Sequence, residues 1–237
     1  MIDIHCHLLP NIDDGPKTCN ESIELLRVLK QQGVETVVAT PHFYPLDTNL
    51  ETFLKQRTAS FDMLSEEIGN EDLPEILLGA EVYYFTGIGK SKSIKSLCID
   101  KTNYLLLELP MCEYNSYIIS DIAGIKENLG ITPIIAHIER YAKMPNYRKI
   151  LGLVDKGICL AQVNTSSVLN KHYERTVKKL IKKGYVSFVA SDAHSAEYRP
   201  PCFDECLAGI KDKFSLSEYT QIVNNISEFL RNNRVEE

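Results

Sequence analysis

Short β-branched apolar runs alternate with amphipathic stretches along the chain, and this alternation constrains the fold more than any other feature. Seven runs are typical of buried strands: residues 2–5, 36–40, 76–81, 104–108, 132–136, 158–163 and 186–190. The stretches between them are long enough for crossover connections, and strands joined by crossovers lie parallel. Because the 237 residues contain no repeat, low-complexity segment or dividing linker, the pattern predicts one α/β domain with a parallel sheet.

Helices are predicted where apolar residues recur at intervals of three and four positions. They are expected at residues 22–32, 50–68, 119–129, 147–156, 173–183 and 216–230. In the second of these helices, the expected apolar side consists of Leu54, Phe61, Leu64 and Ile68. Residues 83–102 are rich in Gly, Lys and Ser and are expected to form an irregular excursion, either a surface loop or a lid.

Charge and hydropathy exclude several classes of protein. The net charge of −6 argues against nonspecific binding to nucleic acid or acidic membranes. No apolar run approaches the roughly 20 residues that span a membrane, and no basic-then-apolar leader precedes the first strand. The seven cysteines lack zinc-ribbon spacing, and Cys202 and Cys206 form only a weak pair. Reduced thiols in a cytoplasmic protein are therefore expected.

Each predicted strand ends in, or just before, a polar residue that can bind a metal or a substrate. In chain order these residues are His5 with His7, His42, Glu81, Glu108, His137, Asn164, and Asp192 with His194. In parallel barrels the carboxyl ends of the strands converge on one face, where active sites lie. Five of the six histidines occupy these ends, whereas His172 opens a helix in a charged stretch and is expected to be exposed.

A single histidine at a strand end is more often a hydrogen-bonded rim residue than a metal ligand. The number of such residues favours a metal site, because several buried carboxylates at one mouth would repel each other without cations. Imidazole and carboxylate ligands without thiolates favour Mn²⁺, Fe²⁺ or Zn²⁺, with Mg²⁺ also possible. At least eight candidate ligands exceed the need of one ion, so two or three divalent ions are expected. Such sites favour hydrolysis of phosphate esters.

Four motifs resemble those of the polymerase-and-histidinol-phosphatase (PHP) superfamily: Asp-Ile-His-Cys-His at 3–7, Ala-Thr-Pro-His at 39–42, Gly-Ala-Glu at 79–81 and Ser-Asp-Ala-His at 191–194. Further segments resemble one branch, the bacterial manganese-dependent protein tyrosine phosphatases of capsule and exopolysaccharide loci. They lie at 9–15, 108–111, 136–141, 162–164 and 199–201. The resemblance implies a distorted seven-stranded (β/α)7 barrel with three metals. That single PHP-type domain would span residues 1–237, with a C-terminal helix and polar tail from about residue 214.

The resemblance also implies a role for each site residue. The first metal would be held by His5, His7, Glu81 and Asp192. Glu81 would bridge to a second metal, completed by Glu108 and His137. The third metal would be held by Asp14, His42 and His194. Asp14 is found only through the resemblance, because beside Asp13 and Gly15 it has the pattern of an ordinary turn residue.

Two arginines and two further positions complete the expected site. Arg140 and Arg199 would bind the phosphoryl group, since guanidinium forks match its oxygens. Phe43 departs from the family pattern, which has a second histidine at this position. The difference is expected to remove no metal ligand but to alter the wall of the pocket. Asp3 points the same way as His5 and is expected either to orient that residue or to make strand-end hydrogen bonds.

The expected reaction is hydrolysis of protein phosphotyrosine by a metal-bridging hydroxide, with Arg140, Arg199 and Asp192 in the catalytic site. A cysteine route is unsupported, because no cysteine has the arginine six positions later that Cys-x5-Arg requires. The resemblance implies that the substrate is the tail of a bacterial polysaccharide-biosynthesis tyrosine kinase. The alternatives are a histidinol-phosphate phosphatase and, less favoured, a non-catalytic regulatory binding protein. The sequence does not indicate the oligomeric state.

Overall fold

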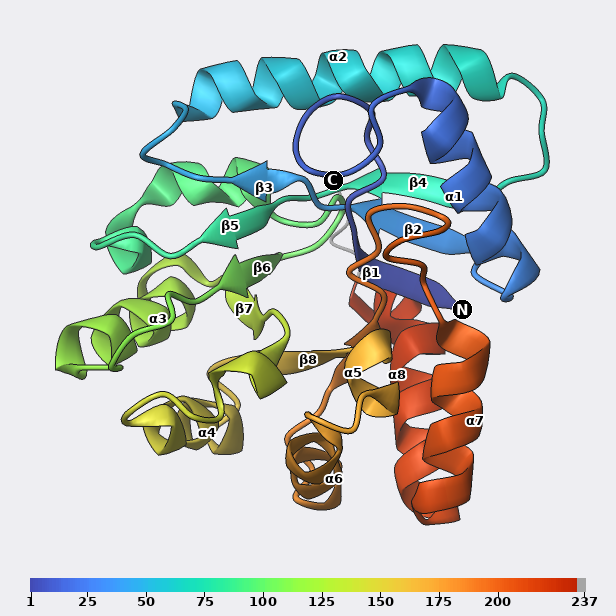
Figure 1. Cartoon of the computed structure of the whole chain (residues 1–237). Coiled ribbons are helices and arrows are strands. Elements are labelled where there is room, and N and C mark those ends of the chain that lie inside the picture. Colours follow the sequence, from blue (N-terminus) through green and yellow to red (C-terminus); the bar gives the residue numbers. More distant parts are fainter. Residues whose placement is uncertain (234–237) are drawn as a thin grey trace.

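The computed structural model describes the backbone of residues 1–233 and the side chains of residues 1–225 (Figure 1). Its strands form a three-stranded sheet of order β1-β2-β4 and a six-stranded sheet of order β3-β5-β6-β7-β8-β9. The first comprises β1 (Ile2–Cys6), β2 (Thr36–Ala39) and β4 (Glu75–Leu78). The second comprises β3 (His42–Phe43), β5 (Glu81–Tyr83), β6 (Tyr104–Glu108), β7 (Thr132–Ile135), β8 (Leu160–Asn164) and β9 (Phe188–Ala190). All the pairings among these strands are parallel.

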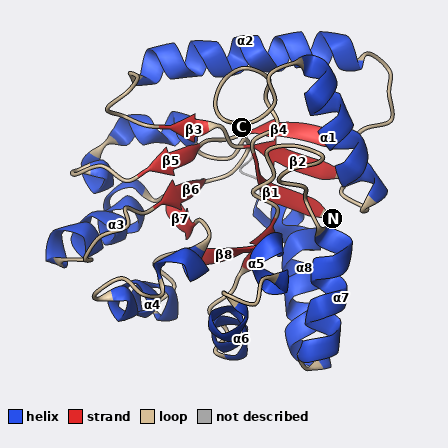
Figure 2. Ribbon diagram, in the orientation of Figure 1, coloured by secondary structure: helices blue, strands red, loops and turns tan. Residues whose placement is uncertain are grey.

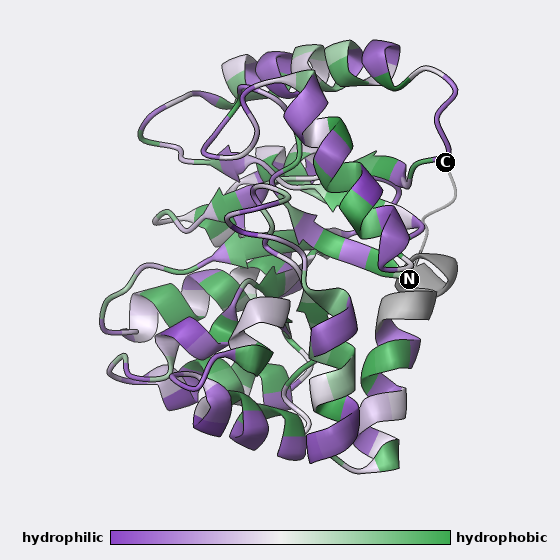
Figure 3. Cartoon of the chain, turned by 45° about the vertical axis from the view of Figure 1, so that its right-hand side comes forward, coloured by the Kyte–Doolittle hydropathy of each residue, from purple (hydrophilic) through white to green (hydrophobic). Residues whose placement is uncertain are grey.

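Helices surround the curled sheet on its outer side (Figure 2). They are α1 (Cys19–Gln31), α2 (Leu50–Ile68), α3 (Ser116–Leu129), α4 (Tyr147–Asp155), α5 (Thr165–Leu169), α6 (Glu174–Lys182), α7 (Phe203–Lys213) and α8 (Leu216–Asn233). Hydrophobic residues are concentrated in the strands and on the helix faces turned toward them (Figure 3). The prediction of a single α/β domain with a parallel sheet is therefore confirmed. Among the described residues, no helix is both long and apolar enough to cross a membrane.

Two of the predicted strands are interrupted, which divides the sheet. Pro41 follows β2 and has no N–H to donate, so β3 starts anew at His42. The run predicted over 76–81 breaks at Gly79 and Ala80, between β4 and β5. Backbone hydrogen bonds continue across both breaks, from Gly79 N to Ala39 O (2.9 Å) and from Glu81 N to Pro41 O (3.1 Å).

The first strand, β1, meets the segment that follows the last strand, β9, although the two lie at opposite ends of the chain. Cys6 forms a parallel bridge with Ala193. The backbone N–H of His7 donates to Ala193 O (2.9 Å), and that of Asp192 donates to His5 O (2.8 Å). These bonds place the N-terminal motif directly beside the Ser-Asp-Ala-His segment.

Residues 83–102 are more ordered than their composition suggests. They contain two 3₁₀ turns, Ile88–Lys90 and Lys92–Leu97, in which Ile88, Ile94 and Leu97 are buried. A Cβ on Gly89 would lie 2.4 Å from Asp121 O, so only glycine permits this close packing against α3. Residues 88–97 therefore form regular turns anchored by buried apolar side chains, while Lys90, Lys92 and Lys95 stay exposed. Helices α5 and α7 were not predicted, although Phe203, Cys206 and Ile210 give α7 a buried face at helical spacing.

The buried face of α2 differs from the expected one. Leu64 is buried as predicted, but its companions are Phe53, Arg57 and Ser60, whereas Leu54, Phe61 and Ile68 are only partly buried. The polar members are accommodated because they donate to backbone carbonyls. Arg57 Nη1 donates to Gly79 O (2.6 Å), Arg57 Nη2 to Ser96 O (3.3 Å), and Ser60 Oγ to Pro10 O (2.7 Å).

Replacing Arg57 with methionine is expected to lower the free energy of unfolding by about 1–3 kcal/mol, because the buried Gly79 carbonyl would lose its donor. Urea unfolding followed by circular dichroism measures the change. Arg175→Met, at an exposed position on α6, is the matched control. An unfolding midpoint that is the same in both variants would show that the Arg57 hydrogen bonds contribute no stability.

Candidate metal centre

The structure brings the polar strand-end residues together on one face of the sheet. The strand register pairs His42 with Glu81 and Tyr83 with Glu108, which places side chains of neighbouring strands at the same level. Every residue assigned to a metal by the resemblance lies in this cluster: His5, His7, Asp14, His42, Glu81, Glu108, His137, Asp192 and His194. His172 lies outside the cluster and is exposed, as expected.

Glu81 lies at the centre of the cluster and is only 1% exposed. Its Oε2 atom lies 3.3 Å from His5 Nε2, 3.2 Å from His7 Nε2 and 3.1 Å from His42 Nδ1. Its Oε1 atom lies 2.8 Å from His137 Nε2. Burial alone would raise the pKa of Glu81, but the imidazoles around it hold that pKa well below its usual value. The carboxylate is therefore ionised and shared.

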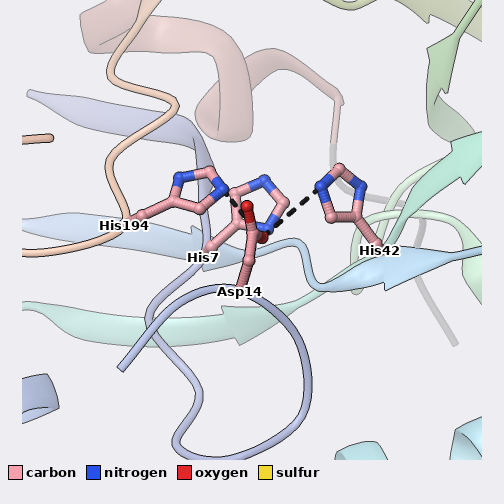
Figure 4. A group of neighbouring side chains, drawn as sticks. All are labelled: His7, Asp14, His42 and His194. Carbon is pink, nitrogen blue, oxygen red and sulfur yellow. Dashed lines mark ion pairs between the residues drawn. The ribbon is translucent and has the colours of Figure 1, made fainter. Parts of the chain in front are cut away.

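A second group surrounds Asp14, in the loop between β1 and α1 (Figure 4). Asp14 Oδ1 lies 3.0 Å from His194 Nε2 and 3.7 Å from His42 Nε2. The His7 and His194 rings stack with centroids 3.9 Å apart. One potential ligand atom from each of His7, Asp14, His42 and His194 lies within 4.8 Å of the others.

The donor atoms fit divalent cations. Similar convergence occurs in two more groups, His5 with His7 and Glu81, and His42 with Glu81 and Glu108. Glu81 Oε2, Glu108 Oε2 and His42 Nδ1 are buried without a hydrogen-bond partner, a costly state that a bound cation would relieve. All these donors are nitrogen or oxygen atoms, which suit Mn²⁺, Fe²⁺, Zn²⁺ or Mg²⁺.

Each of four histidines is held at the ring nitrogen that faces away from the cluster. Such contacts fix the orientation and tautomer of a metal-binding imidazole. The partners are Gln162 Oε1 for His5 Nδ1 (3.2 Å), Asp13 Oδ2 for His7 Nδ1 (2.7 Å), Tyr141 OH for His137 Nδ1 (3.0 Å) and the Asp192 carbonyl for His194 Nδ1 (3.0 Å). Their effect is to direct the opposite nitrogen toward the shared carboxylates.

Three of these partners were missed in the sequence. Asp13 was given no role of its own, but its carboxylate also accepts from Gly15 N (2.9 Å) and His42 N (3.1 Å) and so joins two ligand segments. Gln162 could have been predicted as a site residue, because it lies two positions before Asn164 on β8 and its side chain points to the same side of the strand. Tyr141 has no comparable pattern.

Asp3 makes the strand-end hydrogen bonds that were one of its two expected roles. It accepts from Ser191 Oγ (2.5 Å), from Ser191 N (3.0 Å) and from the backbone N–H of His5 (3.3 Å). These contacts tie β1 to the segment after β9 and do not involve the His5 ring. Burial raises the pKa of Asp3 to about 6.

Asp192 connects the histidine cluster to both predicted arginines. Its Oδ2 accepts from Arg140 Nη2 (2.6 Å) and Asn164 Nδ2 (2.6 Å), and its Oδ1 accepts from Arg199 Nη2 (3.1 Å). Arg199 Nη1 also lies 3.5 Å from Asp14 Oδ2. The two arginine side chains are 35% and 43% exposed, so their remaining donors can meet an anion from solvent.

Two of the strand-end residues have a strained backbone. His137 has φ 32° and Asp192 has φ 51°, both in the left-handed region that non-glycine residues rarely adopt. The hydrogen bonds around them hold these conformations in place. Such strain gathers at functional sites, where the surrounding structure compensates for it.

Fold and site together define a class: α/β proteins with a cluster of imidazoles and carboxylates, flanked by two arginines, at the carboxyl end of a parallel sheet. The chain belongs to the family described as capsular polysaccharide synthesis, CpsB/CapC, whose model matches residues 1–231. The branch resemblance seen in the motifs is thereby confirmed.

The similarity to known proteins extends over nearly the whole chain. Tyrosine-protein phosphatase CpsB of Streptococcus agalactiae serotype III is 29% identical over 99% of this chain and 100% of its own length. Tyrosine-protein phosphatase YwqE of Bacillus subtilis is 30% identical over 99% of this chain and 93% of its own. A putative tyrosine-protein phosphatase CapC of Staphylococcus aureus is 31% identical with the same coverage.

Solved structures agree with the sequence relatives. A chain from the crystal structures of B. subtilis YwqE and Streptococcus pneumoniae CpsB, described as metal-dependent tyrosine phosphatases, matches with a TM-score of 0.84. Its sequence identity is 27%, and the match covers 100% of this chain and 96% of that one. Histidinol phosphate phosphatase of Lactococcus lactis matches with a TM-score of 0.54 at 12% identity, covering 96% and 92% of the chains, and shares the fold alone.

Glu139 offers a test of buried charge beside the cluster. It is 1% exposed, its Oε1 accepts from Asn164 N (3.3 Å), and its Oε2 has no partner. Burial raises the pKa of this carboxyl to about 7. Because the folded-state pKa exceeds the unfolded value, the stabilisation is complete below about pH 4 and is lost as pH rises through 7.

Glu139→Gln is therefore expected to gain roughly 3 kcal/mol of stability relative to the wild type between pH 5 and pH 9. Urea unfolding at both pH values, with chelator in every sample, measures this difference. Glu113→Gln, at an exposed position, serves as the control. Parallel pH profiles for wild type and Glu139→Gln would contradict the raised pKa.

Proposed function

We propose that this protein is a metal-dependent phosphatase that hydrolyses phosphotyrosine in a protein substrate. One observation carries the proposal: Asp192 lies between a cluster of cation ligands and two guanidinium groups, so cations and arginines can act on the same anion. The naming of its relatives as tyrosine-protein phosphatases supports the choice of substrate.

The proposed metal ligands are those that the resemblance implies, and they overlap in part with the three groups of converging donors. His5, His7, Glu81 and Asp192 would hold one cation; Glu81, Glu108 and His137 a second; and Asp14, His42 and His194 a third. The clustering of these donors supports the proposal: His137 Nε2 lies 2.8 Å from Glu81 Oε1 and 3.9 Å from Glu108 Oε1, and His42 Nδ1 approaches the same two carboxylates. We propose two or three ions, Mn²⁺ before Fe, Zn or Mg, because the donor set is imidazole and carboxylate.

Bound cations would lower the pKa of water and neutralise the charge of the phosphoryl group. The arginines would bind its non-bridging oxygens, with Asp192 holding both guanidinium groups in position. Asp13, Gln162 and Tyr141 would keep the imidazoles oriented. No residue need protonate the leaving group, because the phenolate of tyrosine is a good leaving group.

We also infer that the strands complete a distorted seven-stranded (β/α)7 barrel in one domain spanning residues 1–237. The inference counts β2 with β3, and β4 with β5, as single interrupted strands. It is supported by the hydrogen bonds across the two breaks and between β1 and the segment after β9. The expected C-terminal helix corresponds to α8, and the end of the polar tail, residues 234–237, lies outside the described residues.

The proposed substrate is the tyrosine-rich tail of a polysaccharide-biosynthesis tyrosine kinase, acted on in the cytoplasm. The family's description as capsular polysaccharide synthesis supports that setting. Phosphate release with Mn²⁺ from a multiply phosphorylated tyrosine peptide, compared with histidinol phosphate, tests the proposal. Peptide turnover that chelator abolishes is expected. A preference for histidinol phosphate would assign the protein to the alternative activity, and turnover of neither compound would favour a non-catalytic binding role.

A further inference from the structure

A cleft of about 460 Å³ opens beside the metal centre, between the β1–α1 loop, the loop after β3 and the first turns of α2. We call it the α2 cleft. Its walls include Ile12, Asp14, His42, Tyr44, Phe53 and Gln56. The reaction proposed above gives this space no role.

The α2 cleft is continuous with the cation cluster. Asp14 and His42 line the cleft and also belong to the group of converging ligands around His194. Arg199 Nη1 lies 3.5 Å from Asp14 Oδ2 at the same place. A phosphoryl group bound by this arginine and the cations would therefore lie at the inner end of the cleft, and the group attached to it would have room to extend outward.

Aromatic and aliphatic side chains form much of the cleft wall. The Tyr44 ring stacks on His42 with centroids 4.9 Å apart and an interplanar angle of 30°. Phe53 is buried and packs against Phe43 at 5.0 Å, so the residue that departs from the family pattern supports this wall from behind. Ile12 is partly buried beside them. Such surfaces suit a flat apolar ring.

The charges of the site indicate how a substrate with an anionic group and an uncharged ring would be oriented. The arginines, with Asn164, gather around Asp192, where an anion would be bound. The cleft itself carries carboxylates at Asp13, Asp14 and Asp47 and no lysine or arginine among its lining residues. An anionic group is therefore favoured at the arginines, and an uncharged ring in the cleft.

We propose that the α2 cleft binds the tyrosyl ring of the substrate and that the side chains lining it determine the preference for aryl over alkyl phosphates. This inference rests on the proposed function, since it assigns the substrate's ring to a subsite of the same centre. Thr48, just before α2, and Gln56, on α2, line the cleft and belong to none of the ligand groups, so they can be changed to fill it.

The test measures binding without turnover. Calorimetric titration of Mn²⁺-loaded protein with phenylphosphonate and with methylphosphonate separates the ring from the shared phosphonate group. The wild type is expected to bind the phenyl compound about 10-fold more tightly, through ring contacts. Gln56→Trp and Thr48→Trp, each placing an indole ring in the cleft, should remove that preference and leave methylphosphonate binding unchanged. Lys55→Trp, one position along α2 and outside the cleft lining, is the matched control.

Equal binding of the two phosphonates by the wild type would overturn the inference, as would a phenyl preference that persists in both cleft variants. Because neither compound is hydrolysed, this result does not depend on activity. Absence of phosphotyrosine turnover, together with an intact phenyl preference, would instead refute the proposed function and leave the ring subsite in place.

Discussion

Replacing Glu81 with glutamine is expected to reduce phosphotyrosine hydrolysis by at least about 10³-fold, because loss of cation binding removes several kcal/mol of transition-state stabilisation. The substitution keeps the size of the side chain but removes the charge that lies within 3.3 Å of four imidazoles. Bound Mn²⁺, measured by metal analysis after dialysis, should fall in parallel with activity.

Glu66→Gln, on the exposed side of α2, is the control for the loss of one carboxylate. It should retain both metal content and turnover. If Glu81→Gln kept its metal and lost activity, Glu81 would act on the substrate and not through the cations. If it kept both, the shared carboxylate would have no role in the centre.

Replacing Arg140 with alanine is expected to lower kcat by about 10²–10³-fold, the usual cost of removing one preorganised donor to a developing charge. Bound metal should stay constant, since among the described residues the Arg140 guanidinium group hydrogen-bonds to the cluster only at Asp192. Arg140→Lys should recover part of the loss, because lysine supplies the charge but not the planar fork.

Steady-state kinetics and metal analysis together separate the two roles of this residue. Arg148→Ala, at an exposed position on α4, controls for the loss of a positive charge. A fall in metal content in Arg140→Ala would assign the arginine to holding Asp192 in place. Unchanged kinetics would exclude it from phosphoryl binding.

Most of the fold was accessible from the sequence because its elements follow local patterns. Apolar runs and helical periodicities reproduced the order of the strands and nearly all the long helices. Residues 76–81 show the limit. The pattern there predicted one strand, but the structure breaks it at Gly79 and Ala80, and Glu81 begins the next strand instead of ending the first. Arg57, buried on α2, was unforeseen because its partners are carbonyls distant in the sequence.

The sequence by itself determined that polar side chains would gather at one place. Parallel strands share a common edge at their carboxyl ends, so residues at seven such ends must converge whatever their spacing in the chain. That rule requires only the strand positions and their direction, both of which are encoded locally. It brought His5, His42 and His137 into one cluster from segments far apart.

Only the tertiary structure decided which groups orient and supplement that cluster. His5 is held by Gln162, which lies 157 positions away, and the α2 cleft is bounded by three segments that no sequence pattern connects. Such contacts depend on how helices and loops pack over the sheet, and packing is a property of the whole chain. The strand pattern that places Gln162 on the same side as Asn164 therefore does not indicate which imidazole it holds.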